Sequence, residues 1–218
     1  MNVRCIEVSE ERSSKEIIMK VLLTGFQPFG GETMNPAWEA VAGVKEEICG
    51  AQIVKVQVPV TFADAIPVVY EAMKREQPDV VICVGQAGGR SAITPERVAI
   101  NVDDARIADN GGATPTDEPI FADGENAYFS TLPIKKIVEA IRAESIPAAV
   151  SNTAGTYVCN HIMYGVLYYI QKEFPGMTGG FIHVPFCTEQ VLDKSNMPSM
   201  SLENITRGLE AAVRATVE

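Results

Sequence analysis

The sequence predicts an α/β fold, a three-layer α/β/α sandwich around a twisted, largely parallel sheet of mixed type. Strand-like segments alternate with helical ones along the chain, which is typical of βα units. Residues 79–85 and 179–184 are short apolar runs, as expected for central strands covered on both faces. The 218 residues are 46% hydrophobic, enough for a sizeable core.

The first elements follow from local patterns. Residues 1–18 are polar and charged with weak periodicity, so we expect an extension outside the fold, frayed or weakly helical. Residues 19–25 read as a buried strand and a turn. The loop at 26–31 is expected to be rigid and to expose two aromatic side chains. Pro36 then starts a helix to about residue 48, because proline is favoured at the first helical position.

The middle of the chain continues the alternation. Residues 51–60 alternate in polarity and predict a strand. Thr61 is expected to cap a helix over residues 62–76. The run at 79–85 is the next strand and ends in a glycine turn, and residues 93–101 alternate again.

The second half contains one unusually long connection. Residues 103–126 are rich in Asp, Gly, Pro and Thr, which indicates a lid, an interface arm or local disorder. Pro133 starts a helix to about residue 144, and residues 148–151 predict a short strand. Ser201 caps a last amphipathic helix that continues to about residue 213.

Between these elements, residues 151–167 carry the strongest chemical signal. A helix that ends near residue 174 has its apolar side chains at three- and four-residue spacing: Cys159, Ile162, Met163, Val166, Leu167 and Ile170. Thr156 is the best N-cap candidate, with Asn152 or Thr153 as alternatives, so Cys159 falls in the first or second turn. Free N–H groups and the helix dipole there favour the thiolate and lower the thiol pKa. Cys159 is therefore a candidate nucleophile, or else the first core residue of a buried helix.

A cysteine nucleophile needs a base, and the chain has two histidines. His161 is two positions from Cys159 on the same helix, where side chains do not face each other. His183 ends a predicted strand, and in parallel sheets the site lies at the carboxyl ends of strands. We therefore favour His183 as the base, against the alternative of a buried histidine with both nitrogens bonded.

The base in turn needs an orienting carboxylate. Glu96 is the best candidate, because it lies in the apolar setting ITPERVAIN, where an unpaired charge is costly. The alternative is a simple ion pair between Glu96 and one of the nearby arginines: Arg90, Arg97 or Arg106.

Charge and cysteine content exclude several classes of function. A net charge of −10 without a basic block is unfavourable for nucleic-acid binding. The five cysteines have no CxxC or metal-ligand spacing, so we expect neither a metal site nor a cofactor. There is no signal-peptide pattern and no apolar run of membrane-spanning length. We therefore expect a cytoplasmic protein with reduced thiols, without nucleic-acid or membrane partners.

Five motifs, in this order, carry a family resemblance: TGFQPFGG, GQAGGR, ERVAIN, SNTAGTYVCNH and GFIHVPF. Together they resemble the pyroglutamyl-peptidase I family of cysteine exopeptidases, also called pyrrolidone-carboxylate peptidases. The resemblance covers residues 20–218 and implies a phosphorylase/hydrolase-like sandwich. It also implies a single catalytic domain over residues 19–218, removal of N-terminal 5-oxoproline from peptides and proteins, and a homotetramer.

The resemblance also assigns roles. Cys159 falls on the family's nucleophile, His183 on its base and Glu96 on its acidic member. Phe26 and Phe29 fall on aromatics that line the ring pocket. Two further residues, Gln86 and Arg90, fall in the site-flanking turn, and Arg90 is a candidate oxyanion donor. Gln27 replaces an Asp that is frequent in the family, and residues 1–18 lie outside its pattern.

Two other classes of function are weighed against this one. In a nucleoside-phosphorylase-like enzyme, which a similar sheet can host, the GQAGGR turn would cradle phosphate. That assignment gives Cys159 and His183 no joint role. A non-catalytic binder of capped peptides would have no need for a nucleophile.

Overall fold

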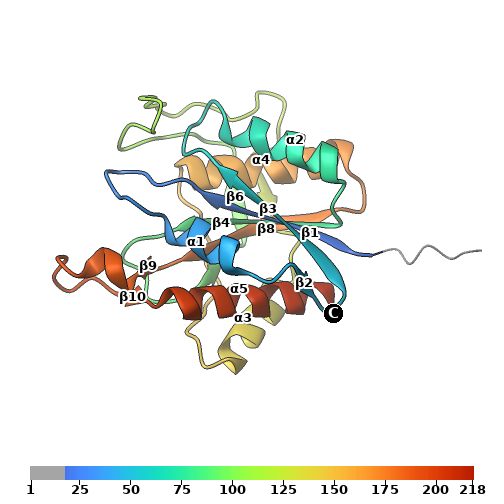
Figure 1. The fold of residues 1–218 in the computed structure, drawn as a ribbon. Helices are drawn as coiled ribbons and strands as arrows, with labels where there is room; N and C mark the ends of the chain where they lie inside the picture. Colours follow the sequence, from blue (N-terminus) through green and yellow to red (C-terminus); the bar gives the residue numbers. More distant parts are fainter. Residues whose placement is uncertain (1–17) are drawn as a thin grey trace, which may run out of the picture.

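The computed structural model describes residues 18–218, and it confirms the predicted α/β/α arrangement (Figure 1). Within these residues, six strands form the main sheet in the order β2-β3-β1-β4-β8-β5. Their bounds are β1 Lys20–Phe26, β2 Glu47–Ile48, β3 Ala51–Val58, β4 Val80–Gln86, β5 Thr94–Pro95 and β8 Thr178–Val184. The extension predicted for residues 1–18 lies outside the described residues, apart from Ile18.

The four central strands are parallel. β1 pairs with β3 and with β4, and β4 pairs with β8, while the edge strands β2 and β5 run antiparallel to their neighbours. Almost every residue of β1, β4 and β8 is buried, as their continuous apolar sequences predict. The sheet is therefore mixed only at its edges.

Helices cover both faces of the sheet (Figure 1). One face packs against α1 (Pro36–Gly43), α3 (Ile134–Ala143) and α5 (Leu202–Val217). The other packs against α2 (Ala65–Glu76) and α4 (Val158–Glu173). None of these helices is both long and apolar enough to cross a lipid bilayer.

Two short ladders complete the described chain. β6 (Val98–Ile100) pairs antiparallel with β7 (Ala127–Phe129). β9 (Phe186–Cys187) pairs with β10 (Ser199–Met200), and the 3-10 helix η1 (Thr188–Val191) lies between them in the sequence. β9 and η1 follow β8 directly, so they lie near its carboxyl end.

Two helix starts or ends differ from the sequence prediction. The helix predicted to reach residue 48 ends at Gly43, because Val44 adopts an extended conformation and Glu47 and Ile48 then pair with β3 as strand β2. The helix predicted from residue 62 begins at Ala65. The hydroxyl of Thr61 instead bonds the N–H and carboxylate of Asp64 in the turn before α2.

The strand predicted over residues 93–101 is split between β5 and β6, which belong to different sheets. The chain crosses between them at Glu96 and Arg97, whose N–H groups bond the carbonyls of Phe181 and Ser151. The strand predicted at 148–151 is reduced to isolated bridges to Ile93 and Glu96. This crossing brings Glu96 to the carboxyl end of β8.

The long connection at 103–126, which we call the arm, has no helix and a single isolated bridge, Asp103 to Glu118. It is nevertheless bonded to the body of the protein. The carboxylate of Asp109 accepts hydrogen bonds from the N–H groups of Phe62, Gly111 and Ala113. The bond from Phe62 ties the first half of the arm to the turn before α2, and the other two bonds close a turn within the arm.

Candidate active site

Cys159 lies in the first turn of α4, as the sequence predicts. The predicted cap is wrong. Tyr157 occupies the N-cap position without a side-chain hydrogen bond, and the hydroxyl of Thr156 donates to the carbonyl of Asp104 instead. No hydrogen bond within residues 18–218 uses the N–H groups of Cys159 and Asn160. The helix therefore presents unpaired donors beside the sulfur.

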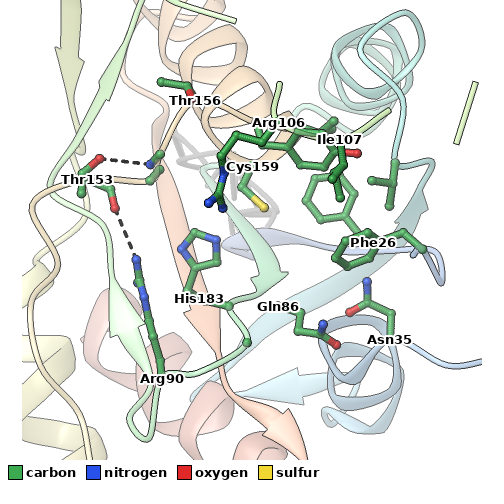
Figure 2. A pocket seen from close by; sticks show the side chains of 18 of the residues that line it. Phe26, Asn35, Gln86, Arg90, Arg106, Ile107, Thr153, Thr156, Cys159 and His183 are labelled. Atoms are coloured by element: carbon green, nitrogen blue, oxygen red, sulfur yellow. Dashed lines mark hydrogen bonds between the residues drawn. The ribbon is translucent and has the colours of Figure 1, made fainter. Parts of the chain in front are cut away.

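His183 lies at the carboxyl end of β8, where its register partner on β4 is Gly85. Its Nδ1 lies 2.7 Å from Oε1 of Glu96, and both side chains are almost completely buried. Because an ionised carboxylate can only accept, Nδ1 carries the proton and Nε2 is left as a free acceptor. Figure 2 shows the His183 ring beside the sulfur of Cys159.

Glu96 has a second partner, Arg90. The Arg90 guanidinium donates to Oε1 of Glu96 at 2.7 Å and to Oγ1 of Thr94 at 2.6 Å. It also reaches the carbonyl of Thr153 at 3.4 Å (Figure 2). The two interpretations of Glu96, base partner and arginine ion pair, therefore apply at once.

His161 is turned away from this group. Its Nδ1 lies 2.7 Å from Oδ2 of Asp103, at the start of the arm, and its ring packs edge-on against Phe62. It does not line the cavity on which Cys159 opens. This agrees with the spacing argument, since positions i and i+2 diverge on a helix.

Cys159 and His183 open onto a cavity of about 770 Å³. Phe26, Phe29 and Gln86 line it as well, so the structure brings the sequence-predicted residues together at one place (Figure 2). Phe26 is buried, whereas we expected it to be exposed. Its ring instead packs against Phe181, with centroids 6.4 Å apart.

Sequence reasoning missed several residues of the wall. The arm contributes Asp104, Arg106 and Ile107, and Ile107 is 56% exposed. Tyr157 and Val158 add apolar surface at the start of α4. The length of the arm was the only available signal, and it could not say which of its residues reach the cavity.

A glycine makes room for the sulfur of Cys159. A Cβ added to Gly85 would lie 2.6 Å from the ring of Phe181 and 3.0 Å from Sγ of Cys159. Both distances are shorter than ordinary contacts, so only glycine lets the sulfur sit against the end of β4. The position of Cys159 therefore depends on Gly85 as well as on α4.

Burial determines the protonation of the site. It raises the pKa of the Cys159 thiol to about 12; the charge of Glu96 adds to this effect and Arg90 opposes it. It also lowers the pKa of His183 below its usual value, although Glu96 pulls the other way. Burial would raise the pKa of Glu96, but the bonds from His183 and Arg90 hold it below its usual value.

The resting site is consequently a neutral thiol beside a neutral imidazole. This differs from the lowered thiol pKa predicted from the helix start. Burial is the first cause of the raised pKa and the charge of Glu96 is the second, whereas the unpaired N–H groups of the helix start act in the opposite direction. The thiol therefore needs a base to take its proton during attack.

No group of three or more His, Cys, Asp or Glu side chains in residues 18–218 is arranged to hold a metal ion. The glycine turn after β4 also does not suit phosphate, since Arg90 is already bonded to Glu96 and Thr94. In the phosphorylase-like alternative, Arg90 would therefore not be free to bind the phosphate.

A thiol, an imidazole and a buried carboxylate at one end of an α/β sheet define the class of cysteine hydrolases. Comparison with known proteins narrows the class. The sequence model of the family "Pyroglutamyl peptidase" matches residues 19–218. The chain belongs to the pyroglutamyl peptidase family of cysteine peptidases.

Individual relatives agree over nearly the whole chain. The pyrrolidone-carboxylate peptidase of Thermosipho africanus is 58% identical over 200 residues, which is 92% of this chain and 98% of the relative. The crystal structure of pyroglutamyl peptidase I from Bacillus amyloliquefaciens is 56% identical, with a TM-score of 0.88, over 91% of this chain and 96% of that one. A mutant pyrrolidone carboxyl peptidase from Pyrococcus furiosus is 43% identical, with a TM-score of 0.88, over 91% and 98%.

Replacing Gly85 with alanine tests the packing of the Cys159 sulfur. We expect Gly85→Ala to lower the rate of amide hydrolysis by about 10²-fold or more, because small misplacements of a reacting group cost that much. The matched control is Gly43→Ala, where the added Cβ meets Thr206 at 3.4 Å or more and little should change. Equal activity of the two variants would show that Gly85 does not set the position of the sulfur.

Proposed function

We propose that this protein removes an N-terminal pyroglutamyl (5-oxoproline) residue from peptides and proteins. One observation carries the proposal most directly: Cys159 and His183 open onto the same cavity as Phe26 and Phe29, in a chain of the pyroglutamyl peptidase family. The relatives' names, pyrrolidone-carboxylate peptidase, support the same substrate. We take residues 19–218 as one catalytic domain.

The cavity suits a neutral lactam. Pyroglutamate has no free ammonium group, so its ring needs apolar walls and a few hydrogen bonds instead of a buried carboxylate. Phe26, Phe29, Tyr157 and Val158 supply aromatic and aliphatic surface. Glu96 is already bonded to His183 and Arg90 and is not available to a charged amine. The lining residues include one carboxylate, Asp104, and also the cation Arg106, so the wall has no unopposed negative charge.

The first half of the reaction forms a thioester. We assign Cys159 as the nucleophile, whose Sγ attacks the pyroglutamyl carbonyl carbon while its proton passes to Nε2 of His183. The resulting oxyanion would face the unpaired N–H groups of Cys159 and Asn160 at the start of α4. His183 then gives the proton to the leaving amine as the C–N bond breaks.

The second half reverses these roles. Water attacks the thioester carbonyl and gives its proton to His183, and the C–S bond breaks with return of that proton to sulfur. Pyroglutamic acid leaves and the thiol is regenerated. No cofactor is required by this sequence of steps.

In this scheme Glu96 orients His183 and keeps its proton on Nδ1. Arg90 balances the charge of Glu96, so the carboxylate raises the pKa of the imidazole less than a free carboxylate would. This differs from the oxyanion role suggested for Arg90, because its guanidinium is already held by Glu96, Thr94 and Thr153.

We further propose a reducing, cytoplasmic setting. The four cysteines within residues 18–218 are all free thiols: Cys49, Cys83, Cys159 and Cys187. The mechanism also requires that Cys159 stay reduced. The homotetramer implied by the family resemblance stays a prediction, and the arm is its candidate contact.

Removing the thiol tests the proposed reaction. We expect Cys159→Ser to abolish hydrolysis of a pyroglutamyl fluorogenic amide, by about 10³-fold or more, while the thermal unfolding curve stays close to wild type. The prolyl amide is the substrate control and should not be cleaved by either protein. Full turnover by Cys159→Ser, or cleavage of the prolyl amide at a similar rate, would refute the assignment.

The pH dependence follows from the protonation of the site. His183 must be neutral to accept a proton, and its pKa is lowered. Activity is therefore present above that pKa and lost as pH falls through it. We expect kcat/KM to fall on the acid side with a midpoint below about 6.5 and to stay flat through neutral pH.

A different pH dependence is expected if Cys159 reacts without help from His183. If kcat/KM rose about tenfold per pH unit from 7 to 9, simple ionisation of Cys159 would limit the reaction. The control is Cys83, whose pKa burial also raises to about 12 but which does not line the cavity. Iodoacetamide should therefore modify Cys159 well before Cys83.

A further inference from the structure

A buried glutamine stands behind one wall of the cavity. Gln190, in η1, is 8% exposed, and its Nε2 donates to Oε1 of Gln86 at 2.9 Å. Gln86 ends β4 and lines the cavity, whereas Gln190 does not line it. The two amides are 104 positions apart in sequence and form a direct link between η1 and the site.

The chemistry of its neighbours fixes which way the Gln190 amide points. The backbone N–H of Cys187 can only donate, so the atom that faces it at 3.1 Å must be Oε1 of Gln190. On the other side, the carboxylate of Glu32 can only accept, and it receives Nε2 of Gln190 at 3.4 Å. Lys194 bonds the same carboxylate and keeps it ionised.

The orientation of the Gln190 amide also fixes the orientation of the Gln86 amide. Both hydrogens of the Gln190 amide are in use, one on Glu32 and one on Gln86, so Gln86 must present its oxygen to Gln190. Its Nε2 has no hydrogen-bond partner within residues 18–218, and it is not one of the buried unpaired atoms. Figure 2 shows the Gln86 side chain on the Phe26 and Asn35 side of the cavity.

We propose that Gln190 is a positioning residue that sets specificity: it holds the Gln86 amide so that N–H donors, never the carbonyl, meet the substrate ring. The inference rests on the proposed pyroglutamyl substrate. The group that these donors fit is the lactam carbonyl oxygen, the feature that separates 5-oxoproline from proline. A proline ring offers a CH₂ there and a cationic amine, which donors repel.

We call the hydrogen bond by which Gln190 orients the Gln86 amide the relay. Replacing Gln190 with glutamate tests it. Once ionised, the new carboxylate still accepts from Cys187 but can donate neither to Gln86 nor to Glu32, so Gln86 turns its nitrogen toward residue 190 and its oxygen toward the substrate. We expect Gln190→Glu to lower kcat/KM for a pyroglutamyl amide by about 10–100-fold, because the Gln86 oxygen then faces the lactam carbonyl oxygen and both are acceptors. The loss should fall on KM, with kcat within about threefold of wild type, since Cys159 and His183 are not touched.

Two further variants separate positioning from general damage. In a Gln86→Met background, Gln190→Glu should have no additional effect on KM, because the residue that it orients is gone. Gln52→Glu on β3, an exposed position, is the matched charge control and should behave as wild type. Gln190→Met serves if Gln190→Glu does not fold, with an expected loss of about 3–10-fold.

A readout without turnover separates this inference from the proposed function. We expect 2-pyrrolidone, a lactam without a scissile bond, to protect Cys159 of the wild type from iodoacetamide, and Gln190→Glu to need at least tenfold more of it. If both results are seen but the wild type does not cleave pyroglutamyl amides, the proposed function is wrong and the relay is supported. Unchanged KM and protection in Gln190→Glu, or an equal loss in both Gln86 backgrounds, would overturn the relay.

Discussion

The buried carboxylate of Glu96 is the constraint on which the site depends. A charge with no exposed surface must be paired, and here a single oxygen, Oε1, receives both His183 and Arg90 at 2.7 Å. These two bonds hold the end of β8, the crossing from β5 to β6 and the glycine turn after β4 in fixed relation. The site is therefore built at the junction of three segments, which none of them could form alone.

The start of α4 supplies what that junction lacks. A helix usually satisfies its first N–H groups with a capping side chain, but Tyr157 offers none. Without a cap, the N–H groups of Cys159 and Asn160 are left unpaired, and these are the donors proposed for the oxyanion. Burial also raises the pKa of the Cys159 thiol to about 12, so the thiol is neutral, and in the proposed mechanism it gives its proton to His183.

The sequence predicted the elements whose signals are local. The apolar runs at 79–85 and 179–184 became β4 and β8, because burial on both faces leaves no room for polar alternation. The helix predicted to reach residue 48 was too long, since residues 47–48 pair with β3, a contact that the local helical pattern does not reveal. Glu96 could be picked out because a charge in an apolar run needs a partner, but the sequence could not choose between histidine and arginine.

Contacts between distant segments could not be predicted. The approach of the arm to the cavity depends on Asp109 bonding the start of α2, 47 positions away. The link between Gln86 and Gln190 depends on how β9 and η1 fold back over β4. Neither leaves a periodicity or a motif, because each is a property of the packed chain.

The tautomer of His183 tests the central claim most directly. With only two histidines, ¹⁵N NMR of histidine-labelled protein can resolve both rings, and His161→Asn assigns them. The account predicts that His183 carries its proton on Nδ1 at pH 7, with Nε2 free, and that this state changes only below about pH 6.5. A proton on Nε2 at neutral pH, or an imidazolium that persists above pH 7, would contradict it.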